Sequence, residues 1–190
     1  METRRIPIGI SDYKEVIDEG FYYVDKTDFI RELLENGSKI TLLPRPRRFG
    51  KTLNLSMLRY FFEKTDGNVF RPLFDGKRIR EWKDFDKHQG QYPVIMLTLK
   101  DCKADTFDKA LELVASELQK EFFRHKYLLD SPVMDSTYRP IFQSLLEGNP
   151  GEVRMQRSLL LLSELLTAHW GMPPLVLLDE YDLSLIHISE

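Results

Sequence analysis

Several features are scarce in this chain of 190 residues, and each shortage excludes a class of protein. The single cysteine, Cys102, excludes an internal disulfide framework and a metal site built from several cysteines. Apolar runs are short, and the one at Leu159–Leu162 is far below the roughly 20 residues that a membrane-spanning helix needs. The first ten residues lack the apolar core of a signal peptide. We therefore expect a cytoplasmic protein without a membrane segment.

The chain also lacks a large excess of charge of either sign. Its formal net charge is −3, so its surface as a whole does not attract nucleic acid, and any basic site must be local. Hydrophobic residues make up 42% of the sequence and charged residues 30%, which is typical of a soluble globular domain and excludes disorder of the whole chain. The length corresponds to one domain.

Short apolar runs alternate with segments of helical period along the chain. The runs predict strands at Ile40–Leu43, Val94–Leu99 and Leu175–Leu178. Helices are expected at about 28–36, directly after Gly50, after Asp105 and at about 153–170, with Ser11 and Asp105 as N-cap candidates. Residues 66–92 are polar and turn-rich without a clear period. The alternation predicts an α/β fold with a parallel sheet.

The segment from Leu43 to Thr52 is the part of the sequence that is most informative about function. It ends in Gly-Lys-Thr, follows a predicted strand and opens a predicted helix, which is the context of a phosphate-binding loop. Unpaired main-chain N–H groups and the helix dipole favour a phosphate at such a helix start. Lys51 supplies charge for the β- and γ-phosphates, and the Thr52 hydroxyl can bind Mg²⁺. Arg45 stands where the general pattern has glycine, so a basic turn that only begins a helix is the alternative.

A second motif follows the last predicted strand. Asp179 stands at its carboxyl end, where a P-loop enzyme needs an acid for Mg²⁺, and Glu180 is placed to polarise the attacking water as a general base. The alternative is a strand that simply runs into an acidic loop. Both motifs in this order favour the nucleotide site.

The residues Arg45-Pro46-Arg47-Arg48-Phe49-Gly50-Lys51-Thr52-Leu53, together with Tyr23–Thr27 and Leu178–Asp182, resemble the bacterial AAA-ATPase-like family. The resemblance implies a P-loop NTPase-like fold with a three-layer parallel sheet, and ATP and Mg²⁺ as ligands. Arg45 to Leu53 (Arg45, Pro46, Arg47, Arg48, Phe49, Gly50, Lys51, Thr52 and Leu53) would bind the nucleotide. Lys51 and Glu180 would be catalytic, and Thr52 and Asp179 would hold the metal. Tyr23–Thr27 would be a family signature without an assigned role.

The resemblance also implies that the chain is a fragment. Residues 1–182 correspond to the N-terminal part of an AAA-ATPase-like domain, truncated after the Asp-Glu strand. Residues 183–190 resemble a translated sequencing adapter, and we expect a non-native tail there. In the family two more strands follow, the first of them between the loop strand and the Asp-Glu strand, and a PD-(D/E)xK nuclease-like domain is often fused. We expect the fragment to be poorly stable and inactive alone.

Three functions remain open from the sequence. The first is an ATP-binding module whose full-length parent hydrolyses ATP with Mg²⁺. The second is a non-hydrolysing, nucleotide-gated regulatory module. The third is a nucleic-acid-binding module that uses the basic cluster of Arg45, Arg47, Arg48 and Lys51. The sequence does not predict the oligomeric state.

Overall fold

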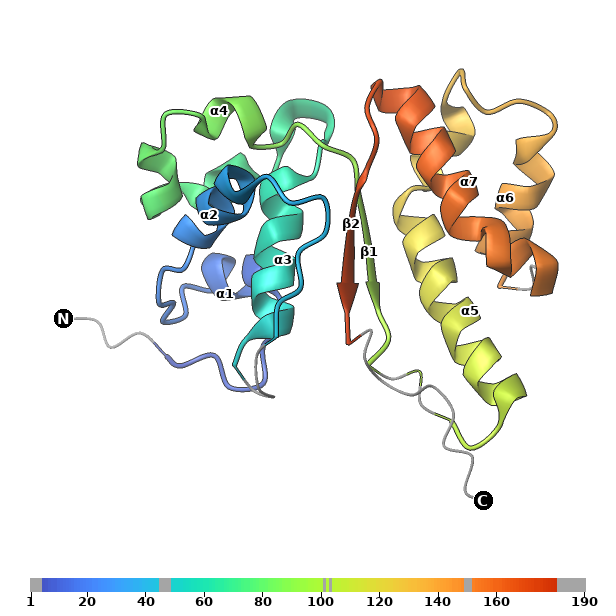
Figure 1. The fold of residues 1–190 in the computed structure, drawn as a ribbon, viewed down its shortest axis with the longest axis horizontal. Helices are drawn as coiled ribbons and strands as arrows, with labels where there is room; N and C mark the ends of the chain where they lie inside the picture. The colour runs from blue at the N-terminus through green and yellow to red at the C-terminus, as the bar shows by residue number, and fades with distance from the viewer. Residues whose placement is uncertain (1–4, 45–48, 101, 103, 149–151, 181–190) are drawn as a thin grey trace. The chain divides into compact units, whose positions relative to one another are not determined.

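The computed structural model describes residues 5–44, 49–100, 102, 104–148 and 152–180. The chain divides into two compact units, unit 1 with residues 1–92 and unit 2 with residues 93–190. Unit 1 is helical in its described residues (Figure 1). Its elements are α1 (Tyr13–Asp18), α2 (Asp28–Asn36), α3 (Lys51–Phe62), η1 (Asp66–Asn68), η2 (Arg71–Phe74), η3 (Arg78–Glu81) and α4 (Phe85–His88).

The core of unit 1 is built largely from aromatic rings. Phe74 stacks on Tyr13 with ring centroids 5.4 Å apart and meets Phe61 of α3 edge-on at 5.2 Å. Phe61 also meets Phe85 of α4 at 5.6 Å. Such pairs stabilise a core beyond the burial of their area. The turn-rich segment 66–92, for which the sequence predicts no element, therefore supplies core residues from short 3₁₀ turns. These turns are too short to show a period.

The predicted N-caps were each wrong by one residue. Asp12, not Ser11, begins α1, and its carboxylate accepts a hydrogen bond from the Glu15 amide. Thr106, not Asp105, begins the long helix of unit 2, and its hydroxyl accepts from the Lys109 amide. The cap is the residue whose side-chain oxygen accepts a hydrogen bond from the amide three positions ahead. Where two adjacent residues are both of capping type, the sequence does not indicate which of them makes this bond.

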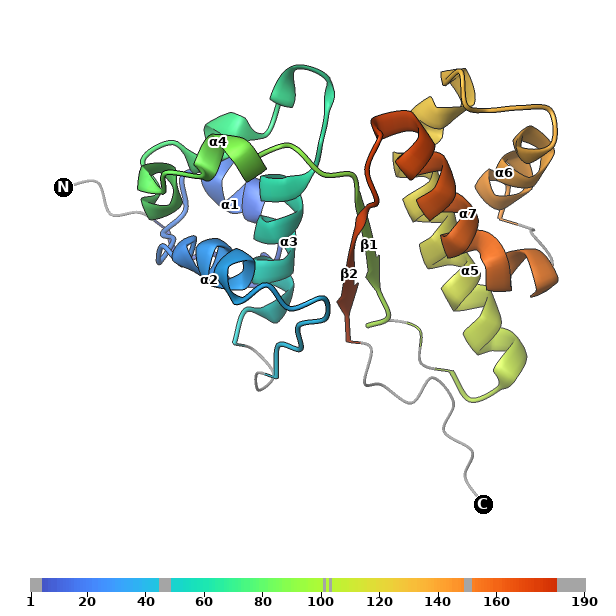
Figure 2. The same ribbon diagram turned by 45° about the horizontal axis from the view of Figure 1, so that its top comes forward.

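Unit 2 is a parallel βαβ crossover with a helical layer (Figure 2). Its strands β1 (Val94–Thr98) and β2 (Leu175–Asp179) pair in parallel from Val94↔Leu175 to Thr98↔Asp179. Between them run α5 (Phe107–Arg124), η4 (Lys126–Asp130), α6 (Tyr138–Leu146) and α7 (Glu152–Trp170). The predicted strands at 94–99 and 175–178 and the predicted helix at 153–170 are therefore confirmed.

The helical layer of unit 2 buries β1 more completely than β2. Ile95 packs with Phe122, Phe142 and the α7 leucines, and Leu97 packs with Leu118. Their partners on the same face of β2, Val176 and Leu178, are 52% and 44% exposed. The α5–α7 layer thus covers β1 and leaves apolar side chains of β2 exposed.

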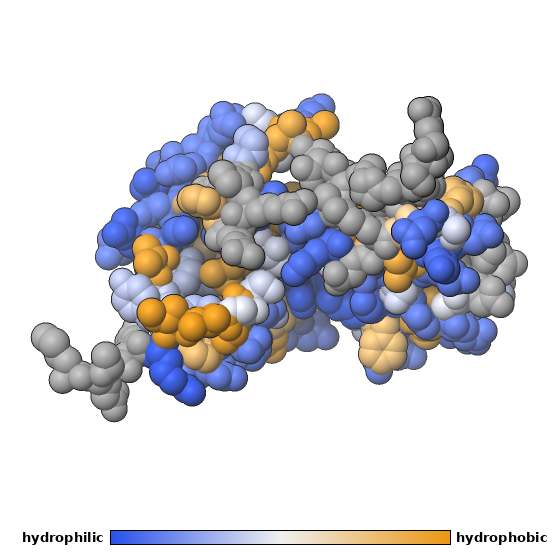
Figure 3. Space-filling view, turned by 90° about the horizontal axis from the view of Figure 1, so that it is seen from below, coloured by the Kyte–Doolittle hydropathy of each residue, from blue (hydrophilic) through white to orange (hydrophobic). Residues whose placement is uncertain are grey.

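The predicted strand at Ile40–Leu43 was wrong, since residues 41–44 adopt no regular secondary structure. Ile40 is 82% exposed and Leu42 is 62% exposed, and Figure 3 shows apolar side chains at the surface of unit 1. An extended segment gains ladder hydrogen bonds only beside another strand. Within the described residues the sheet contains β1 and β2 alone. The mixed α/β character is shown, whereas the three-layer P-loop arrangement stays a prediction.

In the part of the chain that the structure describes, none of the helices combines the length and the hydropathy of a membrane-spanning segment.

Candidate nucleotide-binding site

The start of α3 has the local geometry of an anion-binding helix terminus. Gly50 precedes the helix in the left-handed conformation, with φ 73° and ψ 28°, and its carbonyl accepts the Asn54 amide at 2.9 Å. A Cβ at Gly50 would meet no atom within 4 Å, so the backbone conformation, not lack of space, is what requires glycine here. The first turn contains no acidic residue. Its N–H groups and dipole therefore favour an external anion.

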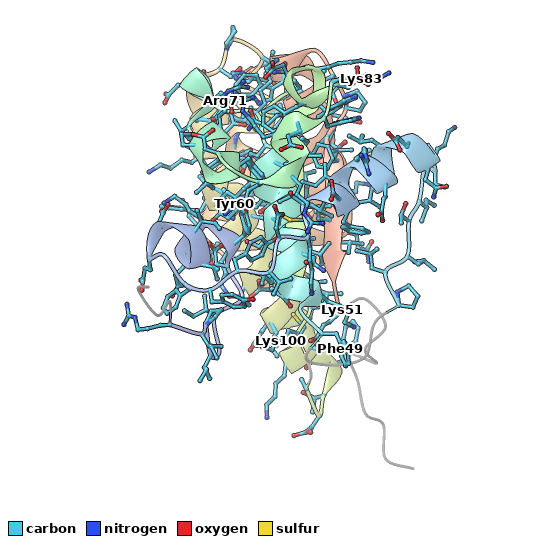
Figure 4. The ribbon with its side chains drawn as sticks, turned by 90° about the vertical axis from the view of Figure 1, so that its left-hand side faces the viewer. Phe49, Lys51, Tyr60, Arg71, Lys83 and Lys100 are labelled. Atoms are coloured by element: carbon cyan, nitrogen blue, oxygen red, sulfur yellow. The ribbon has the colours of Figure 1, made fainter. Side chains whose placement is uncertain are left out.

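The side chains around this terminus fit a polar ligand that approaches from solvent. Lys51 is the first residue of α3 and is half-buried, and Phe49 before Gly50 is 62% exposed. Figure 4 shows Phe49 and Lys51 at the start of the helix and Tyr60 further along it. Thr52 and Leu53 complete the first turn. Arg45, Pro46, Arg47 and Arg48, which belong to the predicted loop, lie outside the described residues.

The N-terminal end of α1 is hydrogen-bonded to the buried side of helix α3. The Asp12 carboxylate accepts hydrogen bonds from the Ser56 hydroxyl at 3.2 Å and from the Tyr60 hydroxyl at 2.9 Å. The Ser56 hydroxyl in turn accepts from the Tyr13 amide at 2.9 Å. These bonds lie on the buried side of α3 and fix the helix that begins at Gly50. This role of Asp12 was not predicted, because Ser11 was the expected cap of the helix.

The signature Tyr23–Thr27 connects α3 to the turn-rich segment. The Tyr23 hydroxyl donates to the Met57 sulfur of α3 at 3.3 Å, and burial raises the pKa of Tyr23 to about 12, which keeps this donor protonated. The Asp25 carboxylate accepts from the Arg78 amide at 2.8 Å and from the amide and hydroxyl of Thr27. The Thr27 hydroxyl, which is fully buried, accepts from the Ile79 amide. In the structure, the signature is thus a clamp between α2, α3 and η3.

We expect the clamp to weaken in acid. Burial by itself raises the pKa of Asp25, but the hydrogen bonds from Arg78 and Thr27 outweigh it and hold that pKa below its ordinary value. A carboxyl whose folded pKa is depressed stabilises the fold above its unfolded pKa, and this stability is lost as pH falls through the folded pKa. The unfolding free energy of the wild type should therefore fall below about pH 4.

Asp25→Asn should lower stability at pH 7 by about 1 to 3 kcal/mol, and its unfolding should depend less on pH in this acid range. Urea unfolding at pH 7 and at pH 3 measures both effects. Glu35→Gln, an exposed change in α2, is the matched control and should leave both unchanged. An equal loss of stability in acid for Asp25→Asn and the wild type would contradict the role of Asp25.

The Asp-Glu pair ends β2 in unit 2. Asp179 is 2% exposed, and its carbonyl accepts the Leu99 amide at 3.0 Å, which extends the ladder by one bond. Glu180 follows with φ 55°, a left-handed conformation that is unfavourable for a residue with a Cβ. Strain of this kind, about 1 to 3 kcal/mol, concentrates at functional sites. No sequence signal would have shown it.

The two halves of the predicted site belong to different units. Gly50, Lys51 and Thr52 open α3 in unit 1, and Asp179 and Glu180 end β2 in unit 2. Their proximity stays a prediction. Among the residues that the structure describes, no group of three or more His, Cys, Asp or Glu side chains could hold a metal ion. A hydroxyl from Thr52 and a carboxylate from Asp179 nevertheless have the oxygen chemistry that suits Mg²⁺.

A glycine-lysine-threonine turn at a helix start, together with a βαβ crossover that ends in Asp-Glu, is typical of nucleotide-binding α/β proteins. The comparison with protein families agrees, because the model of a family described as "Predicted AAA-ATPase" matches residues 7–190. The chain belongs to this predicted AAA-ATPase family.

One curated protein also resembles the chain. An uncharacterized protein in the vnfD 5′ region of Azotobacter chroococcum mcd 1 is 36% identical over 99 residues. The match spans 52% of this chain and 17% of that protein, so the chain corresponds to a small part of a much longer relative. No solved structure matches the chain significantly.

Proposed function

We propose that this chain is the nucleotide-binding part of an ATPase and that it binds ATP through the loop before α3. The observation that carries the proposal is Gly50, which adopts a left-handed conformation directly before Lys51 and Thr52 at an anion-favouring helix start. Membership of a predicted AAA-ATPase family supports the same ligand.

In this proposal the phosphates sit at the first turn of α3. The amides of Lys51, Thr52 and Leu53 donate to phosphate oxygens, and the Lys51 ammonium neutralises the β- and γ-phosphates. Arg45, Arg47 and Arg48 of the same loop add positive charge for the phosphates. Because Gly50 has no side chain, the backbone can approach the phosphates closely.

Hydrolysis requires the carboxylates that end β2. Thr52 and Asp179 would hold Mg²⁺, which supplies neutralisation of the charge that develops on the transferred phosphate. Glu180 accepts a proton from the attacking water as it adds to the γ-phosphorus, and ADP leaves. A strained backbone at Glu180 is consistent with a side chain held for function rather than for stability.

Titration with a fluorescent ATP analogue tests the proposal. The curated relative is much longer than the matched segment, so the full-length protein is the appropriate sample. We expect saturable binding with a dissociation constant on the order of 10 to 100 µM in Mg²⁺ and about tenfold weaker binding in EDTA. A folded full-length protein that binds the analogue under neither condition would overturn the proposal.

A further inference from the structure

The outer edge of β1 can be identified from its hydrogen bonds to β2. The Pro93 carbonyl accepts the Leu175 amide at 2.9 Å, and the Leu99 amide donates to the Asp179 carbonyl at 3.0 Å. Because main-chain groups alternate along a strand, the odd-numbered residues of β1 face β2. The carbonyl of Val94 and the amide of Met96 therefore point to the other edge, away from β2.

Side chains from the last turns of α5 bind both of these groups. The Met96 amide donates to the Glu121 carboxylate at 2.9 Å. The Val94 carbonyl accepts from the Arg124 guanidinium at 2.5 Å and lies 3.1 Å from the His125 Nε2. A carbonyl only accepts, so this contact is a hydrogen bond in the tautomer of His125 that carries a proton on Nε2. In unit 2, α5 runs along this side of β1 (Figures 1 and 2).

The three side chains are also joined to one another, and two of them, Glu121 and His125, are buried. Arg124 donates to Glu121 at 2.5 Å, and His125 Nε2 lies 3.3 Å from the same carboxylate oxygen. Glu121 is 4% exposed and His125 is 2% exposed. A buried carboxylate needs such partners, because an uncompensated charge in this position would be strongly destabilising. The Glu121–Arg124–His125 cluster thus supplies hydrogen-bond partners for main-chain groups on the edge of β1 that faces away from β2.

We propose that the Glu121–Arg124–His125 cluster is an edge lock that closes β1 to any further strand. An added strand would have to lie about 4.8 Å from β1 and use the Val94 carbonyl and the Met96 amide. Both groups are engaged, and the lock side chains occupy the space where that strand would lie. Exposed strand edges promote association with other chains, so a closed edge prevents addition of a second copy of this chain on that side. The proposal is independent of nucleotide binding.

Amide hydrogen exchange in the full-length protein tests the first part of the lock. The Met96 amide of the wild type should exchange slowly, although it faces away from β2. Glu121→Ala should make it exchange about five- to tenfold faster than in the wild type, whereas Leu97, whose amide faces β2, should change much less. Glu112→Ala, an exposed change on the same helix, is the matched control and should alter neither amide. Fast exchange of Met96 in the wild type would overturn the proposal.

Sedimentation velocity at matched concentrations tests the blocking role. The double variant Glu121→Ala/Arg124→Ala should self-associate more than the wild type, and Glu112→Ala should match the wild type. If the Met96 amide exchanges faster in the double variant but self-association does not increase, the cluster does not block strand addition, and this outcome overturns the proposal. Glu121→Gln covers the case in which the alanine variants unfold, because it keeps an acceptor oxygen. It should retain slow Met96 exchange, and fast exchange in a folded Glu121→Gln protein would overturn the proposed hydrogen bond.

Discussion

Replacing Lys51 with alanine is expected to weaken ATP binding by about 100-fold or more. The lysine opens α3 beside the left-handed Gly50, where its ammonium adds a full charge to the partial charge of the helix terminus. Removing it leaves the phosphates with main-chain donors only from this turn. Titration of the full-length variant with the fluorescent ATP analogue measures the change.

Lys39→Ala is the matched control for this experiment, because Lys39 is an exposed lysine of unit 1 in the segment that precedes the loop. It should bind the analogue as the wild type does. Because Lys51 is only half-buried and its side chain is not part of the aromatic core, both variants should keep the wild-type melting temperature. Wild-type affinity in a folded Lys51→Ala protein would remove the basis for placing ATP at α3.

Replacing Glu180 with glutamine is expected to lower the turnover number for ATP by about 10² to 10⁴ while ATP binding is retained. Glutamine has nearly the same shape but cannot accept a proton from water at neutral pH. The change should therefore act on the chemical step and leave the Gly50–Thr52 turn of unit 1, where we propose that the phosphates bind, intact. Phosphate release and analogue titration, both on the full-length protein, separate the two effects.

The same experiment distinguishes ATP hydrolysis from a nucleotide-gated regulatory role. A wild-type protein that binds ATP but shows no turnover above background, with Glu180→Gln unchanged from it, would favour the regulatory function. A Glu180→Gln protein with wild-type turnover would show that another group activates the water. Glu147→Gln, which neutralises an exposed glutamate of unit 2, should not alter turnover.

The candidate site could be predicted from the sequence as far as its chemistry is local. Gly-Lys-Thr at a helix start places a glycine and a nearby ammonium within a few consecutive residues, and the structure has Gly50 directly before α3. The strand before Asp179 was also predictable, because four apolar residues in a row favour a strand, although Val176 and Leu178 are exposed rather than buried. The strain at Glu180 was not, because a backbone dihedral leaves no mark in residue type.

Features that depend on residues far apart along the chain could not be predicted from the sequence. Ile40–Leu43 has the composition of a strand, yet it forms none, because ladder hydrogen bonds require a neighbouring strand and composition alone does not provide one. Asp25 and Arg78 are 53 positions apart, and their hydrogen bond became visible only when the fold brought η3 to the signature. The role of Tyr23–Thr27 as a clamp could not be predicted for this reason.

The sequence by itself determined the local elements of this protein: the glycine turn into α3, the amphipathic α5, and the two apolar strands, because each follows from the preferences of neighbouring residues. Only the tertiary structure decided which buried groups meet. Glu121 of α5 accepts the Met96 amide of β1, and Asp12 holds Ser56 and Tyr60. A buried polar group must find a partner somewhere in the fold, but nothing in its own neighbourhood along the chain specifies which one.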